Sequence, residues 1–362
     1  MKDDNFENFS ISFLFISMSS DKFIGKRIGI FKILNKIDDG TYSTVYLAEE
    51  DIPLSNRSKD KKTEIKENKK TKSNFWRKLP LLRRYVACKI ISREKIEKRN
   101  LLERLGQEIR VSKLMHHPNV LHFIDFQKDD SYFYIFQEYV PCGELFHMIQ
   151  KNGKYSEEKA AILFKQILLG VQYIHSLCIA HCNLKPQNIL VDQFERIKIG
   201  NFGVSKVFLK DTWLTKIPHG SSYYLSPESI GGYPYDAKKS DIWSCGVILY
   251  ILTTGSLPWT ERDKPDLLNQ IKKGDYLRPL NVSENCSNLI SRLMTVDVNQ
   301  RITIEEALTH PFLDKVDVPS AKIDLDFITP RYELKSNVKN HLKHKKEMKS
   351  KKVDKKKEAN RL

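Results

Sequence analysis

Hydrophobic and polar residues alternate after residue 30 in a pattern that is typical of paired β-strands. Phe31, Ile33 and Ile37 fall on one parity, and the alternation resumes at Val45 after an acidic turn that contains one glycine. Because successive side chains of a strand point to opposite faces, this spacing predicts a strand, a turn and a second strand. The aromatic-rich residues 132–139 predict a further strand.

Apolar residues further along the chain recur every three or four positions, which predicts helices that pack on a core. One such helix begins after Ser156, whose side chain suits the N-cap position and is followed by two acidic residues. Thr303 and Glu306 have the spacing of a capping box, and Pro311 ends the helix that they begin. The core-facing positions of the first helix are Ala160, Phe164, Ile167, Val171 and Ile174.

The formal net charge of +16 over 362 residues is concentrated in two segments. Residues 55–84 and residues 335–362 each contain twelve Lys and Arg against three acidic residues, so each carries +9 and the remainder carries −2. Lysine-rich stretches of this kind bury too little apolar surface to offset the entropy of ordering them. We therefore expect a nearly neutral folded body with two basic appendages, which are an insertion at 51–83 and a C-terminal tail.

The six cysteines include no C-x-x-C pair and several lie in apolar stretches, which indicates reduced, buried thiols. No apolar stretch reaches the length of a membrane span, and the short apolar run at 11–16 follows acidic residues rather than the basic start of a signal peptide. These features predict a cytoplasmic protein without a membrane span. The lysine-rich residues 351–357 are a candidate nuclear address.

The most informative stretch is I-A-H-C-N-L-K-P-Q-N-I-L at residues 179–190. It resembles the catalytic loop of protein kinases, H-R-D-L-x-x-x-N, in which the Asp accepts the proton of the substrate hydroxyl and the Asn binds a magnesium ion. In this chain Cys182 stands at the Arg position and Asn183 at the Asp position, whereas Lys185 and Asn188 are retained. A neutral amide cannot act as a base at neutral pH, so the loop lacks its central carboxylate.

Motifs nearer the N-terminus resemble the nucleotide site of the same family. The acidic turn aligns with the glycine-rich loop G-x-G-x-x-G-x-V, with Asp38 and Ser43 in place of two of its glycines. V-A-C-K at 86–89 resembles the V-A-I-K strand, which implies that its lysine pairs with nucleotide phosphates and with a helix glutamate. Q-E-Y-V at 137–140 looks like the hinge whose backbone holds adenine. The resemblance implies weak binding of ATP by Gly40, Val45, Ala87, Lys89, Glu108, Glu138 and Val140.

The metal-binding motif is also altered. Asn201-Phe202-Gly203 stands where kinases carry D-F-G, whose Asp binds magnesium through a carboxylate. Asn188 and Asn201 each offer one neutral oxygen, and a hard cation prefers carboxylate and phosphate oxygens. We therefore expect this pair to hold Mg²⁺ or Mn²⁺ poorly.

Motifs that support the larger lobe are intact. S-P-E at 226–228 resembles the family's A-P-E, and the resemblance implies that Glu228 pairs with Arg301. The matching motifs follow the family's order from about residue 28 to residue 313, and L-K-P at 184–186 marks the serine/threonine branch. C-G-E-L-F at 142–146 is similar to the calmodulin-dependent, AMP-activated and checkpoint kinases.

The resemblance implies an α+β, bilobal protein kinase fold. The smaller lobe is expected to hold a five-stranded sheet and one helix at 28–138, interrupted by the basic insertion, and the larger lobe is expected to be mainly helical at 141–314. Residues 1–27 are expected to form a flexible N-terminal segment, and residues 315–362 a disordered basic tail.

Three functions follow, and the first is favoured. Loss of a general base costs roughly 10²–10⁴ in rate, which favours a catalytically impaired pseudokinase that regulates a protein partner, such as an active kinase or a substrate protein. The alternative is an active serine/threonine kinase that transfers the γ-phosphate of ATP, and a transfer assay with a Lys89→Met control would separate the two. The third is binding of an anionic partner by the basic tail, although no motif for reading specific nucleic acid is present.

Overall fold

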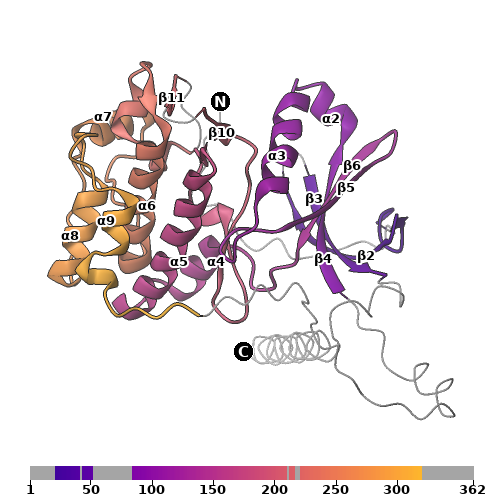
Figure 1. The fold of residues 1–362 in the computed structure, drawn as a ribbon, viewed down its shortest axis with the longest axis horizontal. Coiled ribbons are helices and arrows are strands. Elements are labelled where there is room, and N and C mark those ends of the chain that lie inside the picture. Colours follow the sequence, from indigo (N-terminus) through magenta and orange to yellow (C-terminus); the bar gives the residue numbers. More distant parts are fainter. Residues whose placement is uncertain (1–20, 41–42, 52–83, 210–211, 217–220, 320–362) are drawn as a thin grey trace, which may run out of the picture.

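The computed structural model describes residues 21–40, 43–51, 84–209, 212–216 and 221–319. This part of the chain forms two lobes, a smaller one built on a β-sheet and a larger one built mainly of helices (Figure 1). The predicted two-lobed α+β arrangement is therefore confirmed. Most of the basic insertion and nearly all of the predicted tail lie outside the described residues.

The smaller lobe contains one antiparallel sheet with the strand order β1-β2-β3-β4-β6-β5. It has six strands rather than the predicted five, because a two-residue strand turns back onto Phe31 and Lys32 through Gly29. Gly29 has φ +57°, a conformation that favours glycine over residues with a side chain. The strands are β1 (Arg27–Ile28), β2 (Phe31–Asp39), β3 (Ser43–Glu50), β4 (Arg84–Ser92), β5 (Phe123–Lys128) and β6 (Tyr132–Glu138).

Residues 21–27, which were predicted to be flexible, instead pack on one face of this sheet. The side chain of Phe23 is buried, and its ring makes edge contacts with Tyr46 and Tyr132 at centroid distances of 5.6 and 4.9 Å. Lys26 Nζ donates to the Tyr134 hydroxyl at 2.9 Å. Aromatic contacts of this kind add to the free energy gained from burial, so Phe23 anchors this segment on the sheet.

Helices α2 (Arg93–Glu97) and α3 (Leu102–Leu114) lie on the opposite face of the sheet. Leu105 and Ile109 of α3 belong to a hydrophobic cluster that includes Phe133 and Ile135 of β6. Because residues one turn apart share a helix face, this packing orients Glu108 toward β4.

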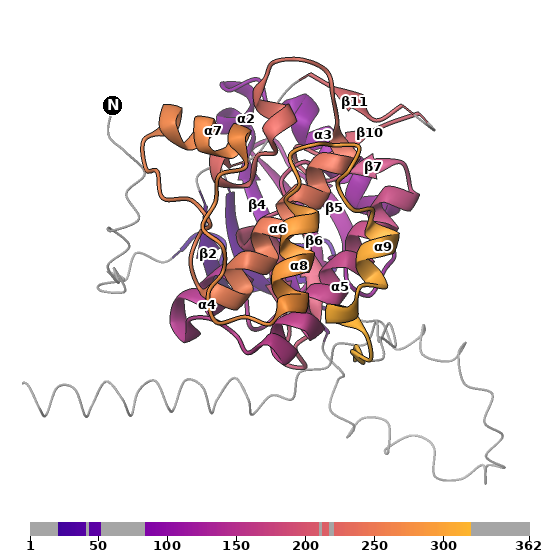
Figure 2. The same cartoon turned by 90° about the vertical axis from the view of Figure 1, so that its left-hand side faces the viewer.

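Helix α6 (Ala237–Thr254) forms the centre of the larger lobe, with α5 (Glu157–Ser176) and α8 (Glu284–Leu293) beside it (Figure 2). The helix α6 has buried residues on all of its faces, and most of them are apolar, as expected of a helix in the centre of a core. The five core positions predicted for α5 are all buried. Further elements of this lobe are α4 (Leu145–Asn152), α7 (Lys264–Lys273), α9 (Ile304–Leu308), β11 (Leu214–Thr215), η4 (Pro227–Ile230), β12 (Tyr235–Asp236) and η5 (Pro311–Leu313).

The predicted helix caps are present. Ser156 Oγ accepts a hydrogen bond from Lys159 N at 3.3 Å, and Thr303 and Glu306 form the reciprocal capping box that begins α9. Across the residues that the structure describes, no helix combines the length and apolar character that crossing a membrane requires.

Candidate active site

The predicted pair of Lys89 and Glu108 is formed. Lys89 on β4 and Glu108 on α3 lie 2.7 Å apart, measured from Nζ to Oε1, and both side chains are largely shielded from solvent. Two further side chains of α3 bind the chain that follows Phe202: Arg104 Nε donates to Gly203 O at 2.8 Å, and Gln107 donates to Ser205 O. Helix α3 therefore places Glu108 where it orients Lys89, as in kinases whose lysine contacts the nucleotide phosphates.

The acidic turn between β2 and β3 is closed by its own hydrogen bonds. Gly40 N donates to Ser43 O at 2.8 Å, and the Asp39 carboxylate accepts from Lys36 Nζ at 2.6 Å and from Thr44. The hydrogen bond from Lys36 holds the pKa of Asp39 below its usual value. Asp39 is exposed and ionised at neutral pH, so it adds negative charge beside the expected phosphate path.

Three more of the predicted nucleotide residues lie nearby in the sheet or follow it. Val45 pairs with Lys89 across β3 and β4, and Ala87 pairs with Gln137 across β4 and β6. Val140 is buried just after β6, and its carbonyl accepts a hydrogen bond from Gly143 N at 3.3 Å. The structure thus places Val45 and Ala87 on the strands beside Lys89 and Val140 at the end of β6.

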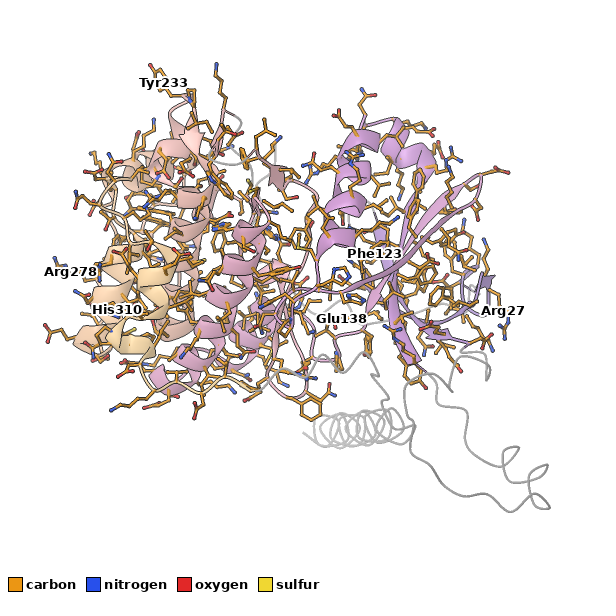
Figure 3. The ribbon with its side chains drawn as sticks, viewed as in Figure 1. Arg27, Phe123, Glu138, Tyr233, Arg278 and His310 are labelled. Atoms are coloured by element: carbon orange, nitrogen blue, oxygen red, sulfur yellow. The ribbon has the colours of Figure 1, made fainter. Side chains whose placement is uncertain are left out.

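Glu138 forms an ion pair between the two lobes. It lies where the two lobes meet (Figure 3), its carboxylate is 3.0 Å from Lys198 Nζ, and its own N–H donates to His122 O at 3.0 Å. Burial raises the pKa of Glu138, and the positive charge of Lys198 opposes that rise. The carboxylate and the N–H of Glu138 therefore already have partners, and the adenine contact expected of the hinge backbone stays a prediction. The sequence carried one signal for this ion pair, which is a lysine within the buried strand β9 (Ile197–Ile199). A buried cation requires a partner of opposite charge.

The catalytic loop is held from α6 and from the strand that precedes Asn201. Asp241 accepts the N–H groups of His181 and Cys182 at 2.8 and 2.9 Å, and it also contacts His175 Nε2 at 2.9 Å. His181 Nε2 lies 2.9 Å from Gly200 O, and complete burial lowers the pKa of this imidazole. The loop is therefore fixed in place, although its base position holds an amide. Sequence reasoning had not assigned Asp241 or His175 to the site.

Three asparagines at the catalytic and metal positions form a hydrogen-bonded series. Asn188 Nδ2 donates to Asn183 O at 2.7 Å, which orients the Asn188 amide with Oδ1 toward Asn201. Asn201 Nδ2 then donates to Asn188 Oδ1 at 2.8 Å. Asn201 has φ +66°, a left-handed conformation that asparagine tolerates better than most residues. An Asp at this position has no side-chain N–H to give, so the bond depends on the substitution.

These contacts decide how well the site fits the family's ligands. The paired Lys89 fits a nucleotide phosphate, as the family's lysine does. The residues do not fit a divalent cation, because Asn188 Oδ1 already accepts a hydrogen bond and neither asparagine supplies the negative charge that such ions prefer. The residues of the site therefore suit a nucleotide phosphate better than a divalent cation.

Lys185 and Cys182 complete the loop. Burial lowers the pKa of Lys185, and the nearby Glu144 partly opposes the change. The Cys182 thiol donates to Ala180 O at 3.6 Å, and burial raises its pKa, so it is a neutral group where the family carries an arginine. The strand β7 (Ile179–Ala180) before it pairs with β10 (Lys206–Val207), and η2 (Pro186–Asn188) and β8 (Ile189–Val191) follow.

The segment after Asn201 ends in an intact ion pair. Arg301 is almost completely buried and binds Glu228 through both of its terminal nitrogens, at 2.7 and 2.9 Å. Arg301 also donates to Thr295 O and Lys239 O, both at 2.9 Å. A bidentate ion pair of this kind fixes the relative orientation of the two side chains as well as balancing their charges. The predicted pair of Glu228 and Arg301 is therefore formed.

Comparison with known proteins decides the family. A family model described as a protein kinase domain matches residues 78–313, which is more than half of the chain. The chain belongs to the protein kinase family. The match begins near the end of the basic insertion, at residue 78, yet β1–β3 before it pair into the same sheet as β4, so the kinase lobe extends further toward the N-terminus.

Curated relatives of this kinase-family chain are serine/threonine kinases. It is 38% identical over 228 residues to a probable serine/threonine-protein kinase of Dictyostelium discoideum, covering 63% of this chain and 27% of that one. It is 39% identical over 229 residues to the SNF1-related protein kinase catalytic subunit alpha KIN12 of Arabidopsis thaliana, covering 63% and 46%. It is 40% identical over 215 residues to the probable serine/threonine-protein kinase KCC4 of Saccharomyces cerevisiae, covering 58% and 21%. The matched region spans less than half the length of each relative, and the predicted serine/threonine family is confirmed.

Proposed function

We propose that this protein is a catalytically impaired member of the serine/threonine kinase family, a pseudokinase that acts as a scaffold or allosteric regulator in phosphorylation signalling. The observation that carries the proposal is the hydrogen bond from Asn201 Nδ2 to Asn188 Oδ1, which engages the oxygen that the family uses for metal. Asn183 removes the base from the same site. Both losses act on one reaction, in which positioning and charge neutralisation supply most of the catalysis.

The intact parts of the fold support a role in binding a protein partner. Each lobe keeps an ion pair that supports its kinase fold, Lys89 with Glu108 in the smaller lobe and Arg301 with Glu228 in the larger. Neither ion pair depends on catalytic activity. A partner such as an active kinase or a substrate protein would contact these ordered surfaces. ATP would bind weakly through Lys89 and without the help of a divalent ion.

An active serine/threonine kinase is the second candidate, and one observation favours it. The Lys89–Glu108 pair and the fixed catalytic loop are the arrangement that phosphoryl transfer requires. Anionic-partner binding by residues 335–362 and a cytoplasmic or nuclear location stay predictions, because those residues lie outside the described part of the chain.

Transfer of labelled phosphate from ATP to a mixed serine and threonine peptide panel separates the two candidates. We expect the native protein to transfer no faster than its Lys89→Met variant, in Mg²⁺ or in Mn²⁺, because the base and the metal carboxylate are both absent. Transfer that exceeds the Lys89→Met control by about 100-fold or more would establish the active kinase instead.

A further inference from the structure

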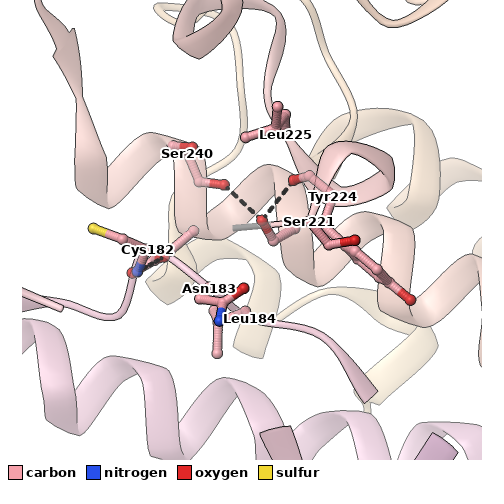
Figure 4. Close-up of a pocket in the computed structure, with 9 residues that line it drawn as sticks. Cys182, Asn183, Leu184, Ser221, Tyr224, Leu225 and Ser240 are labelled. Carbon is pink, nitrogen blue, oxygen red and sulfur yellow. Dashed lines mark hydrogen bonds between the residues drawn. The ribbon is translucent and has the colours of Figure 1, made fainter. Parts of the chain in front are cut away.

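Polar groups of the small pocket beside the catalytic loop are already used in hydrogen bonds within the fold. Here η3 (Ser222–Tyr224) meets the start of α6, and the Ser244 hydroxyl donates to Tyr224 O at 2.9 Å (Figure 4). A second group of ionisable side chains lies where the two lobes meet, around the ion pair of Glu138 with Lys198. The histidines of this second group belong neither to the catalytic loop nor to the expected nucleotide contacts.

The interlobe loop, residues 115–122, connects α3 to β5 and is anchored on the larger lobe. Leu121 N donates to Ile199 O of β9 at 2.8 Å, and Ile199 N donates to Asn119 O at 2.9 Å. Met115, which directly follows α3, is buried in the hydrophobic cluster of the larger lobe. The position of α3 therefore depends on how firmly this loop is held.

Three histidines lie in the interlobe loop. The His117 ring stacks on Tyr173 of α5, with ring centroids 4.8 Å apart, and the rings of His116 and His122 meet edge to face at 5.6 Å. Asn119 N donates to His117 Nδ1 at 3.1 Å. An imidazole that has gained a proton carries N–H on both ring nitrogens, so His117 can accept this hydrogen bond only while it is neutral.

The charges around these imidazoles are mainly positive. Burial lowers the pKa of His117, and Lys198 adds to the effect. Burial also lowers the pKa of His122, and His116, Arg84 and Lys198 act in the same direction. The carboxylates near the group each have a cationic partner, Glu138 with Lys198, Glu50 with Arg84 and Asp192 with Arg196. A proton gained by either imidazole therefore adds positive charge beside Lys198.

Protonation consequently opposes the contact between the lobes. The pKa values of His117 and His122 are lowered while the loop is held, and they return toward the ordinary value of about 6.5 when the loop is released into water. Protons therefore bind the released loop more readily than the held one. The contact has its full stability above about pH 6.5 and loses stability as the pH falls below that value.

We propose that the interlobe loop is an acid-sensitive joint that couples pH to the position of α3. Protonation of His117 removes the acceptor of Asn119 N, and protonation of His122 adds charge beside Lys198, so the loop loosens from β9. Glu108 lies about two helical turns before the loop, so the Lys89–Glu108 pair loses support when the loop is released. The inference goes beyond the proposed loss of catalysis and holds whether or not phosphate is transferred.

Amide hydrogen exchange of the full chain, followed by mass spectrometry, measures the joint locally. Peptides that contain Leu121 and Ile199 report the two N–H groups that bond between the loop and β9. We expect their protection to fall at least about fivefold between about pH 7.5 and about pH 5.5, after correction for the intrinsic pH dependence of exchange. Protection of α3 around Glu108 is expected to fall with it, whereas that of α6 is expected to change less.

Variants of the histidines test the cause. His117→Asn keeps an acceptor oxygen for Asn119 N but does not titrate, and with His122→Gln it is expected to reduce the response to less than about twofold. His147→Gln, on the exposed side of α4, is the matched control and is expected to retain the native response. If the double variant melts at a lower temperature than the native protein at the higher pH, His117→Asn alone is compared, and it is expected to respond less than the native protein.

Three results would overturn the inference. The first is equal protection of the joint at both pH values in the native protein. The second is a response that persists in the His117 and His122 variants, which would assign it to His181 or His310, whose pKa values burial also lowers. The third is a joint that opens while protection around Glu108 is unchanged. The transfer assay can fail or succeed independently of these results, so the two proposals are tested separately.

Discussion

The double variant Asn183→Asp/Asn201→Asp is expected to transfer phosphate to protein hydroxyls at least about 100-fold faster than the native protein. The change at position 183 would restore the base, and the change at position 201 would restore a carboxylate for the metal. The second change also removes the N–H that Asn201 donates to Asn188 Oδ1, so that oxygen is released. The surrounding supports, Lys89–Glu108 and the loop fixed by Asp241, need no further repair.

Single reversions test whether the two positions act together. Each alone is expected to raise transfer by less than about tenfold, because groups that act as one unit do not contribute additively. Labelled ATP and a peptide panel provide the measurement, and Lys89→Met in the double-variant background is expected to abolish the gain. A double variant as inactive as the native protein, with an unchanged melting temperature, would show that another defect, such as the altered glycine-rich turn, limits the reaction.

Arg301→Ala is expected to lower the free energy of unfolding by about 3–5 kcal/mol. The change leaves the Glu228 carboxylate without its partner in a region where Arg301 is only 1% exposed. It also leaves the carbonyls of Thr295 and Lys239 without their donor and removes the guanidinium from the Trp243 ring, 5.1 Å away. Each lost contact is at least partly buried, so solvent replaces none of them fully.

Urea unfolding of Arg301→Ala measures this loss directly. Arg278→Ala is the matched control, because Arg278 is exposed, and its loss is expected to stay below about 0.5 kcal/mol. If Arg301→Ala costs no more than this control, the ion pair does not support the larger lobe as described.

Local signals in the sequence were sufficient for much of the fold. The Ser156 cap and the Thr303–Glu306 box depend on residues three positions apart, and both are formed. The Lys89–Glu108 and Glu228–Arg301 pairs followed from the family's motifs, because each partner lies in a recognisable motif of its own. The sequence therefore predicts an interaction when its partners have a fixed spacing or when each partner lies in a recognisable motif.

Interactions that depend on the folded arrangement were missed. Phe23 anchors residues 21–27 through tyrosines about a hundred positions away or in a neighbouring strand, and no local pattern indicates that contact. The ion pair of Glu138 with Lys198 joins residues 60 positions apart, and the hinge motif alone does not indicate it. The bond between Asn188 and Asn201 likewise depends on amide orientation, which a sequence does not specify.

A thermal-shift titration with ATP, carried out with and without Mg²⁺ or Mn²⁺, tests most directly whether the asparagines have separated nucleotide binding from metal binding. A ligand that binds only the folded state raises stability as RT ln(1 + [L]/Kd), so any contribution of the metal to affinity appears as an added shift. We expect the shift of the native protein to be small and the same in both conditions, and that of Asn183→Asp/Asn201→Asp to grow when metal is added. A metal-dependent shift in the native protein would contradict the proposed loss of the metal site and favour an active kinase.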